Sequence, residues 1–188
     1  MALSRRGGSP HRTELAGDGR LGLSRHTHTG GMATGEIEIA RESPESDLAS
    51  VLLGRYYAEL GSRFPGGFDP DRTAAAPVVE LVPPRGAFLV ARLDGRAVGC
   101  GAVRKLDENT AEVKRMWIEP DVRGRGVGRR LLAALEDAAI ELDCRVLRLD
   151  TSARLTEALA LYRSSGYHEI PAYNDNLYAA HWFEKRLA

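Results

Sequence analysis

Residues 122–130 read Val-Arg-Gly-Arg-Gly-Val-Gly-Arg-Arg and separate a strand-like segment from a helix-like one. The three glycines carry no side chain, so the backbone can approach a ligand closely. The first turn of the helix that follows has unpaired N–H groups and the positive end of the helix dipole, and both favour a bound phosphate. Arginines add positive charge at positions Arg123, Arg125, Arg129 and Arg130. The stretch therefore predicts a phosphate or diphosphate site at the start of a helix.

The segments on either side of this stretch predict a single α/β domain. Alternating or continuous apolar residues predict strands at 36–40, 87–93, 97–103, 111–118, 146–149, 167–170 and 180–187. Apolar residues at helical spacing predict helices at 48–60, 127–142 and 155–162. The Gly- and Pro-rich residues 61–86 predict a loop that holds a brief helix. The turn residues Asp94 and Gly95 predict an antiparallel hairpin.

The amino-terminal residues differ in composition from the rest of the chain. Residues 1–31 are rich in glycine and arginine and contain few large apolar side chains. Such a segment cannot supply a hydrophobic core, so we expect a disordered tail. Met32 opens a more foldable sequence, and it is either the true start or the residue after a dispensable tail. The predicted domain spans residues 32–188.

Composition excludes several classes of function. The chain has 26 basic and 26 acidic residues, which does not favour binding to nucleic acids or to anionic membranes. No apolar run is long enough to span a membrane. Cys100 and Cys144 lie in apolar segments and are expected to be reduced core residues, which favours a cytoplasmic location. We expect no metal site, because His26 and His28 lie in the predicted tail.

Three phosphate-binding motifs can be compared with residues 122–130. A P-loop requires Gly-Lys-Ser/Thr, which is missing, and a dinucleotide fingerprint requires the spacing G-x-G-x-x-G early in a βαβ unit. The pattern R-x-x-G-x-G does match, at Arg123–Gly128, and here the sequence resembles the GNAT acetyltransferase superfamily. Two further segments are similar to that family: the strand Glu112–Ile118, and Ala158-Leu-Ala-Leu-Tyr162 followed by Gly166-Tyr167.

This resemblance covers roughly residues 36–188 and implies both a fold and a cosubstrate. The implied fold is a mixed central sheet of about six to seven strands with a splayed parallel pair, flanked by about four helices. The implied cosubstrate is acetyl-CoA, with its diphosphate on the glycine-rich loop and its pantetheine arm along the central strand. Leu155 replaces an asparagine that often contacts the pantetheine in the family. The implied cofactor-binding residues are Met116, Trp117, Ile118, Arg123, Gly124, Arg125, Gly126, Val127, Gly128 and Arg129.

The apolar pattern of the central strand predicts an irregularity. Val113 and Met116 both suit the inward face, although they lie an odd number of residues apart. One extra residue near Lys114 or Arg115, a β-bulge, would reconcile the two positions. In the family that the chain resembles, such a bulge helps to separate two parallel strands so that the cofactor can enter.

The resemblance also implies catalytic residues. Tyr162 is the expected general acid, which would protonate the departing thiolate, although its helix position also suits a core residue. A base or a desolvating site must deprotonate the amine, because an alkyl ammonium is mostly protonated at neutral pH. Glu112 is the candidate base, and an exposed strand glutamate is the alternative reading. Glu119 and a chain of water molecules are weaker candidates.

The expected function is N-acetylation of a primary amine on a small molecule, or on a protein or peptide, by direct attack on acetyl-CoA. A non-catalytic acyl-CoA sensor and a nucleotide-binding adaptor are the alternatives. The acceptor pocket is expected from the first helix, the loop after it and the last strands, where aromatic and polar groups suit an amino compound that bears a carboxylate. Pairing through exposed strand edges would give a homodimer. The expected lining residues are Tyr56, Tyr57, Arg63, Phe64, Phe68, Tyr173 and Asn176.

Overall fold

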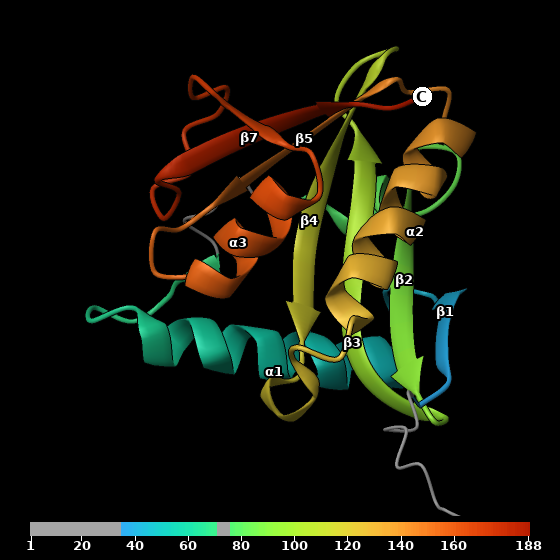
Figure 1. Cartoon of the computed structure of the whole chain (residues 1–188), viewed down its shortest axis with the longest axis vertical. Helices are drawn as coiled ribbons and strands as arrows, with labels where there is room; N and C mark the ends of the chain where they lie inside the picture. Colours follow the sequence, from blue (N-terminus) through green and yellow to red (C-terminus); the bar gives the residue numbers. More distant parts are fainter. Residues whose placement is uncertain (1–34, 71–75) are drawn as a thin grey trace, which may run out of the picture. The chain divides into compact units, whose positions relative to one another are not determined.

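A computed structural model of the chain describes residues 35–70 and 76–188, which form a seven-stranded sheet (Figure 1). The strand order is β1-β2-β3-β4-β5-β7-β6. Only β4 and β5 pair in parallel, and the other neighbours are antiparallel, which confirms the predicted mixed sheet. The predicted tail lies outside the described residues. The strands are β1 (Ile37–Arg41), β2 (Gly86–Leu93), β3 (Arg96–Lys105), β4 (Thr110–Ile118), β5 (Val146–Thr151), β6 (His168–Ile170) and β7 (His181–Arg186).

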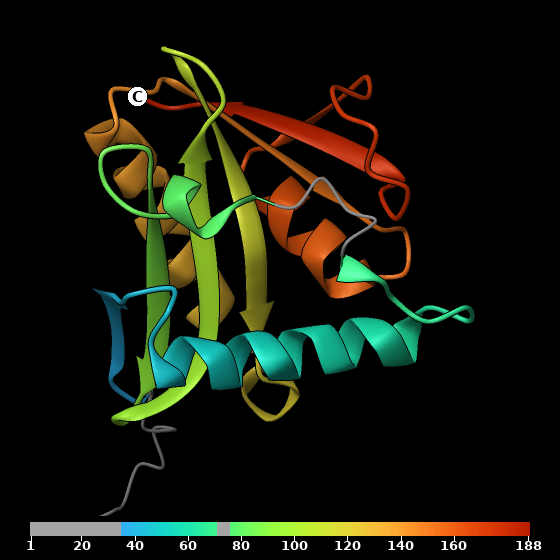
Figure 2. The same cartoon turned by 180° about the vertical axis from the view of Figure 1, so that it is seen from behind.

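Helices cover both faces of the sheet. The helix α1 (Asp47–Arg63) crosses β3 and β4 on one face (Figure 2), and α2 (Val127–Glu141) and α3 (Thr156–Ser164) lie on the other (Figure 1). The described residues therefore hold three α-helices, fewer than the four or so predicted. The described residues also include the single-turn 3-10 helices η2 (Val78–Glu80) and η3 (Pro120–Val122). The helix η2 stays short because prolines precede and follow it closely, at Pro77, Pro83 and Pro84.

Local sequence signals explain where the helices begin and what they bury. The Ser46 hydroxyl accepts a hydrogen bond from the Ala49 amide at 3.1 Å and thereby caps α1, as its residue type predicts. The apolar face of α2 packs on the sheet through fully buried leucines, and each contributes on the order of 2 kcal/mol. These leucines are Leu131, Leu132 and Leu135. Among the described residues no helix is long and apolar enough to cross a membrane.

The parallel strands β4 and β5 separate toward their carboxyl ends (Figure 1). Their pairing stops at Glu112 and Arg148, whereas β4 continues to Ile118. The register between β3 and β4 shifts in the same region, because Cys100 faces Trp117 and Ala102 faces Lys114. One extra residue therefore lies on β4, and Arg115 has a φ of 54°. The predicted bulge is confirmed, and it places the end of β4 away from β5.

Candidate functional site

The glycine loop, defined as residues 123–128, ends at the first turn of α2. Gly124 and Gly126 have φ values of 78° and 84°, a region that glycine adopts without strain. No heavy atom lies within 4 Å of a Cβ built on either residue, so backbone conformation and not space requires glycine there. Arg130 N donates the first internal hydrogen bond of α2, to Gly126 O at 3.1 Å. The amides before it are free to bind an anion, because no side chain caps this helix.

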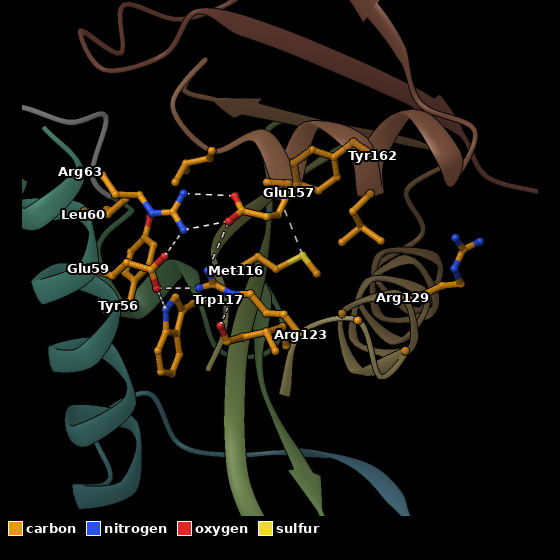
Figure 3. A pocket seen from close by; sticks show the side chains of 17 residues that line it. Tyr56, Glu59, Leu60, Arg63, Met116, Trp117, Arg123, Arg129, Glu157 and Tyr162 are labelled. Carbon is orange, nitrogen blue, oxygen red and sulfur yellow. Dashed lines mark hydrogen bonds and ion pairs between the residues drawn. The ribbon is translucent and has the colours of Figure 1, made fainter. Parts of the chain in front are cut away.

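A cavity of about 340 Å³ adjoins this loop, and we call it the loop cavity (Figure 3). Its walls come from α1, the end of β4, the glycine loop, the first turn of α2, and α3. Arg125 is exposed and Val127 is buried in the first turn of α2, and neither lines the cavity. The other predicted cofactor residues do line it, namely Met116, Trp117, Ile118, Arg123, Gly124, Gly126, Gly128 and Arg129.

The arginines of the stretch divide into two groups. Arg123 is turned inward, where its Nε donates to Ile118 O at 2.9 Å and its Nη2 donates to Glu59 Oε2 at 2.6 Å. Arg125, Arg129 and Arg130 are exposed and form no ion pair with any residue that the structure describes. Arg123 therefore holds the loop against α1, and the exposed arginines are the ones available to a phosphate.

An ion-pair network crosses the loop cavity from α1 to α3 (Figure 3). Arg63 donates to both carboxylate oxygens of Glu157 at 3.1 Å, and it also pairs with Glu59 at 2.7 Å. Burial alone would raise the pKa of Glu59, but hydrogen bonds from Arg123 and from the Trp117 indole outweigh it and lower that pKa. The network therefore fixes the spacing between the two helices at this cavity.

Replacing Glu157 with glutamine should lower the melting temperature at neutral pH but not in strong acid. The hydrogen bonds from Arg63 lower the pKa of Glu157 from 4.5 to about 2, so the ion pair stabilises the fold above pH 4.5. This stabilisation is lost as the pH falls from 4.5 toward 2. Because the side chain is 54% exposed, we expect a difference of only a few degrees between wild type and variant.

Calorimetric melting between pH 3 and pH 7 measures this difference. Glu108→Gln is the control, because Glu108 is exposed in the turn between β3 and β4 and its side chain contacts no described residue. A gap between wild type and Glu157→Gln that stays constant across this pH range would contradict the assignment.

A second cavity of about 300 Å³ adjoins the loop cavity. We call it the aromatic cavity, because its wall includes Tyr57, Phe64, Phe68 and Tyr178. Its polar lining consists of Lys114, Arg115, Asp150 and Asn176, together with Thr151 and Ser152. The two cavities share a wall that is formed by Tyr56, Leu60, Met116, Leu155, Ala158 and Tyr162.

Tyr162 lies in this shared wall, with its side chain directed toward Met116 (Figure 3). Its hydroxyl donates weakly to the Met116 sulfur at 3.9 Å, and its ring packs against Tyr167 and Phe183. Burial, and next the negative charge of Asp150, raise the pKa of Tyr162. The hydroxyl is therefore protonated at neutral pH. The core reading is confirmed, because Tyr162 is buried, and its role as general acid stays a prediction at a residue that lines both cavities.

Glu112 lies away from both cavities and is fully buried. Arg104 donates to it at 2.9 Å, Lys114 pairs with it at 3.1 Å, and the Tyr173 hydroxyl donates to it at 2.9 Å. These groups occupy its carboxylate, and Glu112 itself does not line the aromatic cavity. Glu119, at the end of β4, pairs with Arg55 and Arg96 and also lines neither cavity. The position of Glu112 therefore favours a structural role.

The aromatic cavity differs in part from the acceptor lining expected from the sequence. The expected residues Tyr56, Tyr57, Phe64, Phe68 and Asn176 do line it. Arg63 lines the loop cavity instead, and Tyr173 lines neither. Arg115, Asp150 and Tyr178 were missed. Of these three, only Asp150 had a signal in the sequence, because it is a charged residue at the end of an apolar strand.

The cysteines are buried and unpaired, as expected for core residues. Burial raises the pKa of the Cys100 thiol to about 12, so at neutral pH it is a thiol and not a nucleophilic thiolate. The Cys100 sulfur donates to Arg115 O at 3.7 Å, next to the bulge. A covalent intermediate on this residue is therefore not favoured.

Comparisons with known proteins agree with this geometry. Residues 54–167 match the family described as Acetyltransferase (GNAT) family. The IAA acetyltransferase of Azospirillum brasilense is 36% identical over 132 residues, which cover 70% of this chain and 84% of that protein. The N-alpha-acetyltransferase RimI of Mycobacterium tuberculosis is 35% identical over 116 residues, which cover 60% of this chain and 71% of that protein.

A solved structure supports the same assignment at the level of the fold. The PaiA N-acetyltransferase of Thermoplasma acidophilum, in complex with coenzyme A, aligns with a TM-score of 0.60. The alignment covers 80% of this chain and 99% of that one at 17% identity, and it shows a shared fold. Together with the glycine loop and the splayed strands, these matches show that the chain belongs to the GNAT family of acetyltransferases.

Proposed function

We propose that the protein transfers an acetyl group from acetyl-CoA to a primary amine of a small molecule, by direct attack within a ternary complex. One observation carries this proposal: two cavities meet at Tyr162, and one of them adjoins a helix N-terminus that can bind phosphate. A donor in the loop cavity and an acceptor in the aromatic cavity would therefore meet at the shared wall. Holding two reactants in this way supplies much of the catalysis in such a reaction.

The loop cavity is the proposed acetyl-CoA site. The amides of Val127, Gly128 and Arg129 would bind the diphosphate, and the exposed arginines would add charge. The pantetheine arm would follow β4 beyond Glu112, where the strand has no partner in β5. Backbone groups of Met116–Ile118 would polarise the thioester carbonyl. Leu155 lines the cavity and offers the pantetheine an apolar contact.

The proposed chemistry needs three proton transfers. The amine nitrogen attacks the thioester carbon, the carbon–sulfur bond breaks, and the Tyr162 hydroxyl donates its proton to the departing sulfur. The new amide nitrogen releases its surplus proton, which returns through water to the Tyr162 oxygen. The ammonium proton must leave before the attack. Asp150 is the candidate to receive that proton, directly or through water, because it lines the aromatic cavity and Glu112 does not.

Acetyl-CoA should stabilise the purified protein against heat, whereas ATP and NAD should not. Ligand at a hundred times its Kd adds about 2.7 kcal/mol to the stability of the folded state. A thermal-shift comparison of the three ligands measures this effect, and release of coenzyme A thiol in the presence of an amine panel measures turnover. A folded protein that ignores millimolar acetyl-CoA would refute the proposal. Binding without thiol release for any amine would indicate a sensor.

A further inference from the structure

The aromatic cavity has an apolar part and a charged part. Its rings contact one another directly, with centroids 4.7 Å apart for Phe68 and Tyr178 and 5.0 Å apart for Phe64 and Tyr178. Tyr57 stacks on Phe68 at 6.1 Å and extends this surface along α1. Such a surface binds a flat apolar group through burial and ring-to-ring contact.

The charged part of the aromatic cavity contains one positive charge that no described residue neutralises. Lys114 pairs with Glu112 at 3.1 Å and with Asp150 at 3.2 Å, so its charge is matched. Arg115 donates from Nη2 to the neutral carbonyl of Ala76 at 2.9 Å. Within residues 35–70 and 76–188, Arg115 forms no ion pair. The lining therefore favours a ligand with a negative group.

The backbone of Arg115 is also constrained by its place in the β-bulge. It lies in the bulge with a φ of 54°, and its carbonyl oxygen accepts from the Cys100 thiol. Its guanidinium is partly buried and always charged, and it can bind both oxygens of a carboxylate. A fixed arginine of this kind selects for a carboxylate more sharply than a mobile surface residue does.

We propose that the acceptor is an aromatic α-amino acid, whose carboxylate binds Arg115 and whose ring packs among Phe64, Phe68 and Tyr178. This inference rests on the proposed function and names its substrate class. The ammonium group of such an amino acid lies next to its carboxylate, and Asp150 in the same cavity carries the complementary charge. The volume of about 300 Å³ is at the low end for small-molecule sites and suits a single amino acid.

Other amines match this cavity less well. A polyamine or an aminoglycoside brings only positive charge, and Arg115 would repel it. A peptide amino terminus has an aromatic ring when its first residue is phenylalanine, but it has no carboxylate beside its amine. Both classes lack a carboxylate beside the amine, and this makes them informative controls.

Acetylation of L-phenylalanine should be compared with that of phenethylamine, L-phenylalaninamide and L-alanine. Phenethylamine and the amide keep the ring without the carboxylate, and L-alanine keeps the carboxylate without the ring. We expect kcat/KM for L-phenylalanine to exceed each of the others by at least about tenfold. Coenzyme A thiol release measures these rates.

Arg115→Gln tests the arginine itself. Loss of a charge-assisted hydrogen bond should lower kcat/KM for L-phenylalanine about 30-fold, mainly through KM. The same variant should change phenethylamine turnover less than about threefold, and Arg115→Lys should restore part of the loss. Arg145→Gln is the matched control, since Arg145 is exposed, its side chain forms no hydrogen bond or ion pair with a described residue, and it lines neither cavity.

The outcomes separate this inference from the function that it rests on. Equal use of L-phenylalanine and phenethylamine, or an equal loss of both in Arg115→Gln, would overturn the inference. Acetyl-CoA binding together with turnover of non-aromatic amines alone would also overturn it and would leave the proposed function standing. A preference for L-phenylalaninamide would point to peptide amino termini. Failure to bind acetyl-CoA would remove both proposals.

Discussion

Gly126→Val is expected to weaken acetyl-CoA binding at least about 100-fold, because the first turn of α2 would no longer face the diphosphate. Gly126 has a φ of 84°, and a β-branched residue is strongly disfavoured there. The strain costs roughly 1–3 kcal/mol, so the loop would take a different conformation. Since no heavy atom lies within 4 Å of the added Cβ, the effect would come from the backbone and not from a clash.

Isothermal titration with acetyl-CoA measures the Kd of this variant, and circular dichroism confirms that it is folded. Gly54→Val is the matched control. Gly54 is an exposed glycine of α1 with a negative φ, it has no neighbour within 4 Å of an added Cβ, and it lines neither cavity. A Kd for Gly126→Val within about threefold of wild type would show that the loop does not bind the diphosphate in the proposed way.

Tyr162→Phe is expected to lower kcat about 100-fold while the Kd for acetyl-CoA changes less than about threefold. The lost group is one hydroxyl that makes only a weak hydrogen bond to sulfur, so the fold should tolerate phenylalanine. The departing thiolate would then lack its proton donor. Rapid-mixing assays of thiol release at saturating acetyl-CoA separate this step from binding.

Tyr167→Phe is the matched control for this variant. Tyr167 is buried, and its ring lies 5.9 Å from that of Tyr162, but it lines neither cavity. Its kcat should stay near that of wild type. If both variants lose turnover and melting temperature together, the effect is one of packing, and if neither loses turnover, Tyr162 is not the acid.

The sequence predicted the parts of this structure that depend on local pattern. The bulge followed from the positions of Val113 and Met116, and the start of α2 followed from the glycines that precede it. Both features are properties of neighbouring residues in one element. Tyr162 was placed by its helix position together with the motif, and the structure puts it where two cavities meet.

The partners of charged side chains could not be predicted in this way. Arg123 was expected to face a phosphate, but its partner Glu59 lies 64 positions earlier in the chain. Glu112 was expected either at the cleft or exposed on its strand, but residues from two other segments enclose it, namely Arg104, Tyr173 and Asn174. These pairings depend on how helices and strands pack, which a short pattern does not encode. The predicted number of α-helices was too high for a simpler reason, because prolines limit η2 to one turn.

The shared wall would couple the two proposed ligands energetically. Tyr56, Met116 and Tyr162 border both cavities, so a donor that shifts these side chains also changes the surface offered to the acceptor. Thermodynamic linkage makes this effect symmetrical, and each ligand must alter the affinity for the other by the same factor. Occupancy of one cavity would then change the affinity of the other, and selectivity for the amine would be a joint property of both bound molecules.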